Sequence, residues 1–355
     1  MIKYRQQKHR RELHMKKLEG YTHGIDLGGW LSQCDYSQDR LENFIKEEDI
    51  AKIKSWGLDH VRVPVDYNIF QDDKGGFIPS GFVYVDRVLD WCEKYGLNMI
   101  LDLHKTRGFS FDKGENESNF FNDPALQQSF YDLWEEFSKR YVQYSDRLAF
   151  ELLNEVTDKE YIDEWNRISG EAIKVIRKYS TDIKIIVGSY WNNSIDAMKD
   201  LAAPADENIV YTFHCYDPLI FTHQGAYWVD VMTPDFRISY PDTIEHYRKV
   251  TNDIGLGGLC DFDHVTAENL SQQYFEERFS EAKRVAEERN VAVYCGEYGV
   301  INLAAPQDTL NWYKDIHGAF EKFGFGRAAW SYKEMDYGLS DEHISGVIEE
   351  LVKYF

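Results

Sequence analysis

Short, uninterrupted apolar runs alternate with longer amphipathic segments from about residue 20 to the end of the chain. A run whose apolar residues are continuous, rather than alternating with polar ones, is typical of a strand that is buried on both faces. Eight such runs predict strands at residues 23–27, 58–63, 97–103, 148–153, 183–188, 209–214, 291–296 and 326–330.

The segments between these runs carry apolar residues at helical spacing, as Ile50, Ile53 and Trp56 illustrate. They predict helices at residues 47–56, 83–95, 125–144, 161–179, 274–289, 309–323 and 340–355. Eight strands that alternate with about eight helices favour the α/β class and a closed (β/α)8 TIM barrel. A doubly wound open sheet is the structural alternative, but no Gly-rich phosphate-binding motif follows the first strand.

One connection is much longer than the connections of ordinary barrels. It runs from Asp217 to about Leu270, between the sixth strand and its helix. We interpret residues 217–270 as a subdomain inserted on the rim of a single barrel domain, residues 21–355, which a basic extension, residues 1–20, precedes. The insertion is rich in aromatic residues, and we expect one of them, Trp228, to contact the substrate.

The charge of the chain excludes some partners. Its 61 acidic residues outnumber its 40 basic ones, for a formal net charge of −21. Binding to nucleic acid or to an anionic membrane needs clustered Lys and Arg, so neither partner is expected. A neutral glycan is compatible with this charge. The 9 Trp, 24 Tyr and 21 Phe residues could supply flat stacking surfaces for sugar rings, as well as core.

The five cysteines are scattered and include no close pair for a metal or redox site. They suggest a reducing compartment. No run of about 18 apolar residues predicts a membrane-spanning helix, and the basic start lacks the apolar segment of a secretory signal. We therefore expect a cytoplasmic protein without a metal or other cofactor; its oligomeric state stays open.

Two glutamates close two of the buried runs. Glu155 follows the fourth run and Glu297 ends the seventh. In a parallel barrel the carboxyl ends of all strands meet at one rim, where barrel enzymes keep their active sites. A pair of carboxyl groups there suits the cleavage of a glycosidic bond, which needs one carboxyl as acid/base and another as nucleophile or base.

Other polar or aromatic residues lie at the same ends of the predicted strands. Each has a plainer explanation by itself: an arginine can be a structural ion-pair partner, a histidine or tryptophan can be core, and a histidine with a carboxylate can bind a metal. Their coincidence at successive strand ends favours a shared substrate site. The candidates are Arg62, His104, Asn154, His214, Tyr216 and Trp330.

These positions resemble the site of the family 5 glycoside hydrolases. The resemblance covers about residues 24–332 and rests on the segments Gly-Ile-Asp-Leu-Gly-Gly-Trp30, Asp-His-Val-Arg62, Leu-Asp-Leu-His104, Glu-Leu-Leu-Asn154-Glu155, Phe-His214-Cys-Tyr216 and Cys-Gly-Glu297-Tyr-Gly. It implies a retaining glycosidase with Glu155 as acid/base and Glu297 as nucleophile. It further implies that Asn154 holds the sugar 2-hydroxyl and that Trp330 forms the floor of the pocket.

The substrate is the weaker part of the prediction. The segment Gly-Gly-Trp-Leu-Ser-Gln-Cys-Asp-Tyr and the missing signal favour an exo-acting β-mannosidase that cleaves short mannosides, such as mannosyl-N-acetylglucosamine. The alternative is an endo-acting β-1,4- or β-1,3/1,4-glucanase, since the insertion resembles that of clostridial endoglucanases. A non-catalytic carbohydrate-binding barrel and an unrelated metal-dependent barrel enzyme are more remote alternatives.

Overall fold

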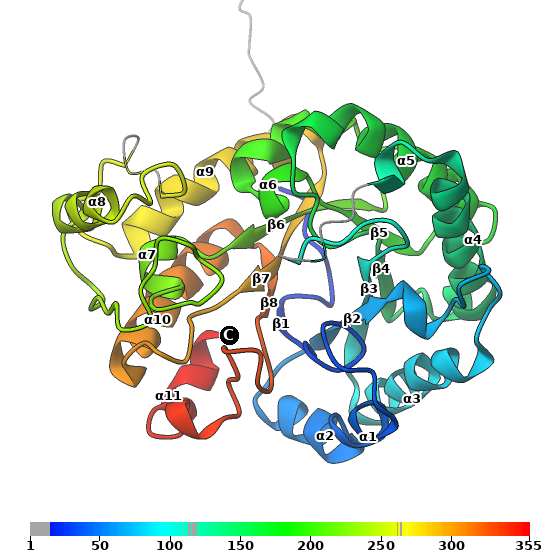
Figure 1. Ribbon diagram of the computed structural model, residues 1–355, viewed down its shortest axis with the longest axis horizontal. Coiled ribbons are helices and arrows are strands. Elements are labelled where there is room, and N and C mark those ends of the chain that lie inside the picture. Colours follow the sequence, from blue (N-terminus) through cyan, green and yellow to red (C-terminus); the bar gives the residue numbers. More distant parts are fainter. Residues whose placement is uncertain (1–14, 113–114, 116–118, 261, 263–264) are drawn as a thin grey trace, which may run out of the picture.

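The computed structural model describes residues 15–355 except 113–114, 116–118, 261 and 263–264. Within this part of the chain eight parallel strands close into a barrel in sequence order (Figure 1). The predicted (β/α)8 TIM barrel is therefore confirmed. The strands are β1 (His23–Asp26), β2 (His60–Asp66), β3 (Asn98–Lys105), β4 (Leu148–Glu151), β5 (Lys184–Val187), β6 (Ile209–Cys215), β7 (Ala292–Tyr298) and β8 (Gly326–Ala329).

The strands are buried on both faces, which explains their continuous apolar runs. Outward-facing residues such as Val61, Val63 and Val65 of β2 pack in the main core with the helices. A separate inner cluster closes the barrel near the strand starts; it contains Leu18, Tyr21, Ile100, Ala149, Ile186, Val210, Ala292, Tyr294 and Ala328. The polar inward-facing residues lie farther along the strands, toward their carboxyl ends.

Six long helices surround the barrel where amphipathic segments were predicted. They are α2 (Glu47–Ser55), α3 (Pro79–Tyr95), α4 (Pro124–Tyr141), α5 (Ile162–Arg177), α9 (Gln272–Arg289) and α10 (Pro306–Phe323). Both α3 and α10 begin with proline and end at a glycine in the left-handed region, Gly96 and Gly324. Proline presets the backbone of a first turn, and glycine accepts the left-handed C-cap at little cost.

The predicted final helix, residues 340–355, is wrong. The structure has the 3-10 turns Glu342–Ile344 and Val352–Tyr354 around the one-turn helix α11 (Ile348–Leu351). Ser345 and Gly346 interrupt the segment, and glycine is a poor residue for a helix interior. The barrel also lacks a full helix after β5 in the described residues: α6 (Tyr190–Asn193) and a 3-10 segment (Ile195–Asp200) stand there.

Two short helices occupy the long connection between β6 and α9. They are α7 (Leu219–Thr222) and α8 (Ile244–Asp253), which lie beside α9 and α10 at the left of Figure 1. Tyr240 links this connection to α10, because its hydroxyl donates to Asp315 at 2.8 Å, while its ring packs on Phe221 of α7. An additional short helix, α1 (Gln38–Asn43), follows β1 and was not predicted.

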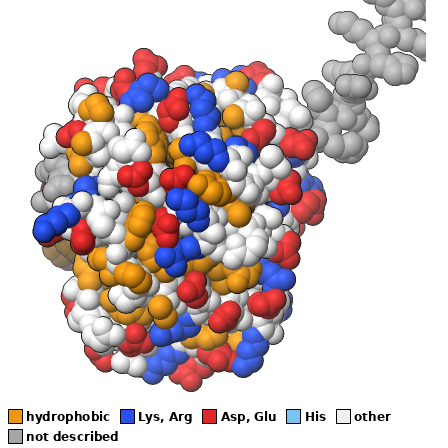
Figure 2. All heavy atoms as spheres, turned by 90° about the vertical axis from the view of Figure 1, so that its right-hand side faces the viewer, with side chains coloured by type: hydrophobic (Ala, Val, Ile, Leu, Met, Phe, Trp, Pro, Cys, Tyr) orange, Lys and Arg blue, Asp and Glu red, His pale blue; other side chains and the backbone are white. Residues whose placement is uncertain are grey.

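The surface charges are mixed (Figure 2), and the cysteines form no disulfide among the described residues. Acidic and basic side chains are interspersed over the face shown in Figure 2. All five cysteines are free, and Cys92, Cys215 and Cys295 are buried as small core residues. Among the described residues, the helices include none that is long and apolar enough to cross a membrane.

Candidate active site

The structure brings the predicted strand-end residues together at the carboxyl rim of the barrel. Arg62 lies on β2, His104 on β3, His214 on β6 and Glu297 on β7. The others follow directly on strands: Asn154 and Glu155 after β4, Tyr216 after β6 and Trp330 after β8. Parallel register places all of these positions at one end of the barrel.

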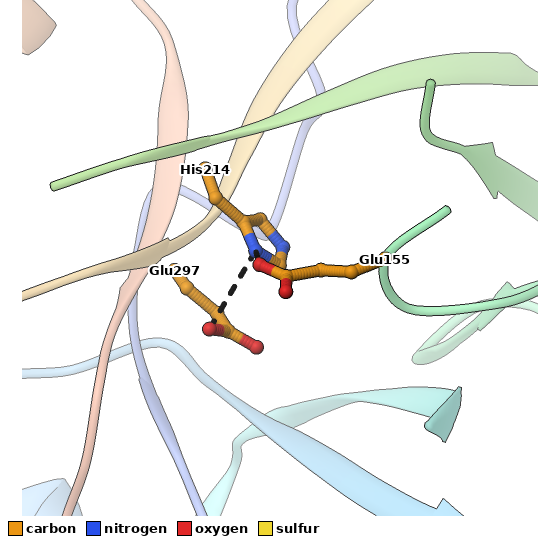
Figure 3. A group of neighbouring side chains, drawn as sticks. All are labelled: Glu155, His214 and Glu297. Atoms are coloured by element: carbon orange, nitrogen blue, oxygen red, sulfur yellow. Dashed lines mark hydrogen bonds and ion pairs between the residues drawn. The ribbon is translucent and has the colours of Figure 1, made fainter. Parts of the chain in front are cut away.

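The side chains of Glu155 and Glu297 point toward each other at the carboxyl rim, and His214 lies beside both (Figure 3). One oxygen of each carboxyl and a ring nitrogen of His214 all lie within 4.8 Å of one another. His214 Nδ1 lies 2.6 Å from Glu155 Oε1 and 3.5 Å from Glu297 Oε2. Carboxyl groups about 5–5.5 Å apart characterise retaining glycosidases, whereas inverting enzymes need a wider gap for water.

Arg62 organises the acidic groups beneath this pair. Its fully buried guanidinium donates to Glu297 Oε1 at 2.9 Å and to Asn154 Oδ1 at 2.7 Å. It also pairs with Asp26 at 2.9 Å, with Asp102 at 3.0 Å and with Glu151 at 2.7 Å. A buried charge needs partners, so this single arginine orders several strand ends at once.

The three deeper carboxylates were not predicted as site residues. Burial raises the pKa of Asp102 to about 7, against the opposing charge of Arg62. Burial also raises the pKa of Glu151, and that of Asp26 well above its usual range. The sequence contained a usable signal, because an acidic residue inside an apolar run, as in Leu101-Asp102-Leu103, has to find a buried cation.

The two candidate catalytic glutamates have different environments. Tyr216 donates its hydroxyl to Glu297 Oε2 at 2.9 Å, so Glu297 accepts from a phenol on one oxygen and from Arg62 on the other. Burial raises the pKa of Glu155, against a hydrogen bond that Asn192 donates to its Oε2 at 2.7 Å. An acidic proton is therefore easier to hold on Glu155 than on a solvated glutamate.

His104 and Trp330 form one wall of the site. Their rings are parallel within 2°, with centroids 5.7 Å apart. His104 Nδ1 lies 2.6 Å from Asp102 Oδ2, and burial lowers the pKa of His104 to about 3. The ring is therefore neutral near pH 7. Its Nε2 lies 3.3 Å from Oε1 of Gln33, a residue that the sequence did not single out.

Trp228 reaches this wall from the β6–α9 connection. Trp330 belongs to a buried cluster with Ala226, Ile301 and Tyr337, and the partly buried Trp228 packs against that cluster. The rings of Trp228 and Tyr337 lie 6.4 Å apart. The structure thus places Trp228 against the cluster that contains Trp330.

The donor set of Glu155, His214 and Glu297 could also be considered for a metal ion. The hydrogen bonds around His214 describe a different use, in which its ring pairs with a carboxyl group. Asn193 donates Nδ2 to the carbonyl oxygen of Asn154 at 2.6 Å, and the same nitrogen lies 3.3 Å from His214 Nε2. His214 Nε2 is therefore the acceptor, and its Nδ1 carries the proton toward Glu155. In this tautomer the His214 nitrogen that faces the two carboxyl groups serves as a hydrogen-bond donor.

Two opposed carboxyl groups over a buried arginine, on a (β/α)8 barrel, define a retaining glycosidase site. The family model described as cellulase (glycosyl hydrolase family 5) matches residues 21–336. The chain therefore belongs to glycoside hydrolase family 5, and it is a retaining β-glycosidase of the cellulase type.

Relatives and solved structures agree with this membership. The chain is 47% identical to cellodextrinase A of Ruminococcus flavefaciens over 88% of this chain and 86% of the relative. It is 36% identical to endoglucanase C of Acetivibrio thermocellus over 93% and 96% of the two chains. A structure of the cellulose synthase subunit Z of Clostridioides difficile matches with a TM-score of 0.72 and 27% identity, over 93% of this chain and 99% of that one.

The relatives bear on the predicted substrate. Both curated relatives are named for action on glucans, so the comparisons favour the cellulase alternative over the exo-acting β-mannosidase that the sequence suggested. Specificity for mannosides is not shown. In the segment that motivated it, from Gly28 to Tyr36, Gln33 lies beside His104.

Proposed function

We propose that this protein hydrolyses β-1,4-glucosidic bonds of cellodextrins, with Glu155 as acid/base and Glu297 as nucleophile. The single observation that carries the proposal is the pair of facing carboxyl groups, whose nearest ligand oxygens lie within 4.8 Å. Carboxyl groups that lie close together suit direct attack of one of them on the sugar carbon, as in retaining glycosidases.

In the first step Glu297 attacks the anomeric carbon while Glu155 gives its proton to the leaving glycosidic oxygen. A covalent glycosyl ester on Glu297 forms, the old C–O bond breaks, and Glu155 becomes a carboxylate. In the second step Glu155 takes a proton from water, whose oxygen attacks the same carbon. The ester bond breaks, Glu297 returns to its ionised form, and the β-configured sugar leaves.

The surrounding residues support these two roles. Arg62 and Tyr216 each donate to one oxygen of Glu297, which fixes the orientation of the nucleophile. Arg62 also holds Asn154 through its amide oxygen, which leaves the amide nitrogen available to a sugar hydroxyl. We assign Asn154 to the 2-hydroxyl, and Trp330 with His104 to the ring being cleaved.

The names of the relatives support a gluco-configured substrate. We favour soluble cellodextrins over long polymers because the 47% identical relative is named a cellodextrinase. The cytoplasmic location predicted from the sequence stays a prediction, which fractionation of the producing cells would test.

Product analysis tests the substrate. Purified protein would be incubated with cellotriose to cellohexaose, mixed-linkage glucan, manno-oligosaccharides and mannosyl-β-1,4-N-acetylglucosamine, with Glu297→Ala as the inactive control. Release of glucose and cellobiose from cellodextrins supports the proposal. Efficient cleavage of the mannosides alone would contradict it and restore the exo-β-mannosidase prediction.

A further inference from the structure

Three consecutive residues after β5 adopt the left-handed region although none is glycine. Trp191, Asn192 and Asn193 have φ angles of 51°, 54° and 57°. Such angles are unfavourable for L-residues with a side chain, and strain of this kind persists only where the surroundings impose it. The turn that these residues form, residues 191–193, lies in α6 on the rim of the barrel.

The turn is tied to the segment that carries Glu155. The backbone N–H of Trp191 donates to the carbonyl oxygen of Thr157 at 3.2 Å, and that of Asn192 to Val156 at 3.0 Å. The side chain of Asn192 then reaches Glu155 itself and donates Nδ2 to Oε2 at 2.7 Å. The left-handed backbone thus aims one amide at one oxygen of the acid/base carboxyl.

The next residue acts on the other oxygen through a histidine. Asn193 donates to the carbonyl of Asn154 at 2.6 Å, which fixes the orientation of its amide. The same amide nitrogen faces His214 Nε2 at 3.3 Å, so Nε2 accepts and Nδ1 carries the proton. His214 Nδ1 lies 2.6 Å from Glu155 Oε1 and therefore donates to it.

Space for this arrangement depends on a glycine. A Cβ atom at Gly188 would lie 2.0 Å from Asn193 Oδ1, so only glycine there lets the Asn193 side chain occupy its place. Asn193 is completely buried, and its position leaves no alternative orientation toward solvent.

We propose that turn 191–193 is a positioning element for the acid/base: Asn192 holds Oε2 of Glu155, and Asn193 selects the His214 tautomer that donates to Oε1. The inference rests on the proposed role of Glu155. Two N–H donors on one carboxyl stabilise its ionised form. That form arises when Glu155 gives up its proton and is also the form that acts as base in the second step.

Other groups also act on the charge of Glu155, from several elements. They are Arg62 on β2, Asp102 and His104 on β3, Asp112 in the loop after β3, His214 on β6, Tyr216 after β6 and Glu297 on β7. All of these groups remain in a variant of Asn192. A change in the pH profile of such a variant therefore reports on the Asn192 hydrogen bond.

The test compares Asn192→Gly, Asn192→Asp and Asn193→Gly with wild type. Glycine accepts the left-handed backbone and removes only the side chain. Asn290→Gly is the matched control, because Asn290 also has a φ of 51° but caps α9 at the start of β7, the opposite end of the barrel. The readout is the pH profile of kcat/KM on cellotetraose and on 2,4-dinitrophenyl β-cellobioside, whose leaving group needs no acid.

Loss of a hydrogen-bond donor to the Glu155 carboxylate raises the pKa of Glu155. In Asn192→Gly the alkaline limb of the kcat/KM profile for cellotetraose therefore moves up by about one pH unit. It moves further in Asn192→Asp, where a second carboxylate faces Glu155, and it also rises in Asn193→Gly. For the dinitrophenyl substrate, kcat/KM of the Asn192 and Asn193 variants stays close to the wild-type value. The pH profile of Asn290→Gly also stays close to that of wild type.

Alkaline limbs of Asn192→Gly and Asn192→Asp that overlay the wild-type limb would overturn the inference. The variant Glu155→Ala separates this failure from failure of the proposed function. If azide restores its turnover of the dinitrophenyl substrate while the Asn192 limbs stay in place, Glu155 is the acid/base and only the role of the turn is wrong. Full cellotetraose activity in Glu155→Ala would reject both.

Discussion

One carboxyl oxygen of Glu155 and one of Glu297 lie within 4.8 Å of each other. The two residues stand at the ends of β4 and β7, which are not neighbours in the barrel. His214 lies beside the pair and contacts both carboxyl groups. The closed barrel makes this meeting possible, because its parallel strands end at one rim. In the proposed mechanism, the sugar carbon that reacts lies between the carboxyl groups of Glu155 and Glu297.

The first prediction concerns Glu155. In Glu155→Ala, kcat/KM on cellotetraose falls about a hundredfold to ten-thousandfold, since the leaving sugar oxygen loses its proton donor. The first step on 2,4-dinitrophenyl β-cellobioside is nearly unchanged. Added azide, which needs no base, attacks the intermediate and yields β-cellobiosyl azide, identified by NMR. An α-configured azide would contradict a retaining mechanism.

The second prediction compares a buried with an exposed arginine. Replacing Arg62 by methionine leaves four acidic groups without their shared cation, so the free energy of unfolding falls by about 3–5 kcal/mol. Arg284 also has two acidic partners but lies exposed on α9. Denaturant titration of Arg284→Met should therefore show little change. If the free energy of unfolding fell equally in Arg62→Met and Arg284→Met, burial of the Arg62 ion pairs would not explain their contribution to stability.

The third prediction concerns Trp228. Because its ring packs against the cluster that contains Trp330, Trp228→Ala loosens the proposed sugar-binding surface of Trp330 and raises KM for cellotetraose about tenfold, with a smaller change in kcat. Leu259→Ala is the control, since Leu259 is a large exposed apolar residue on the same β6–α9 connection. Steady-state kinetics of the two variants give the comparison. An unchanged KM in Trp228→Ala would remove Trp228 from the substrate site.

The fourth prediction concerns stability against acid. Burial lowers the pKa of His223 to about 4, below the usual 6.5. Between pH 6.5 and about 4, His223 is therefore protonated in the unfolded chain but not in the folded protein. The free energy of unfolding decreases as the pH falls through this window. In His223→Phe the free energy of unfolding should fall less steeply in that window, by at most about 1.4 kcal/mol per pH unit.

Urea titrations at several pH values measure this slope. The control is His246→Phe, because His246 is exposed on α8. A slope in His223→Phe that equals the wild-type slope would show that His223 does not take up the proton in that window.

The barrel could be predicted because its strands need no tertiary information to be recognised. β6 and β7 begin within one residue of their predicted starts, since fully buried strands leave continuous apolar runs. The last segment was misjudged as one helix because its apolar spacing outlasts the break at Gly346. Periodicity alone does not register such a break.

Some residues of the candidate site could likewise be predicted from the sequence, and others could not. Residues at the strand ends, such as Arg62 and Glu297, could be found because strand ends share one rim in any parallel barrel. Asn192 and Asn193 could not, because they reach the site from a loop whose left-handed backbone has no pattern in the sequence. Loops after strands carry function through geometry that only the folded chain displays.

The most direct test of the central claim is to trap the intermediate. The protein would be inactivated with 2,4-dinitrophenyl 2-deoxy-2-fluoro-β-cellobioside, whose fluorine slows the second step, then digested and sequenced by mass spectrometry. We predict one fluorocellobiosyl group per chain, bound as an ester to Glu297, and no labelling of Glu297→Ala. A label on any other residue, or turnover without a trapped ester, would contradict the assignment of Glu297 and the mechanism built on it.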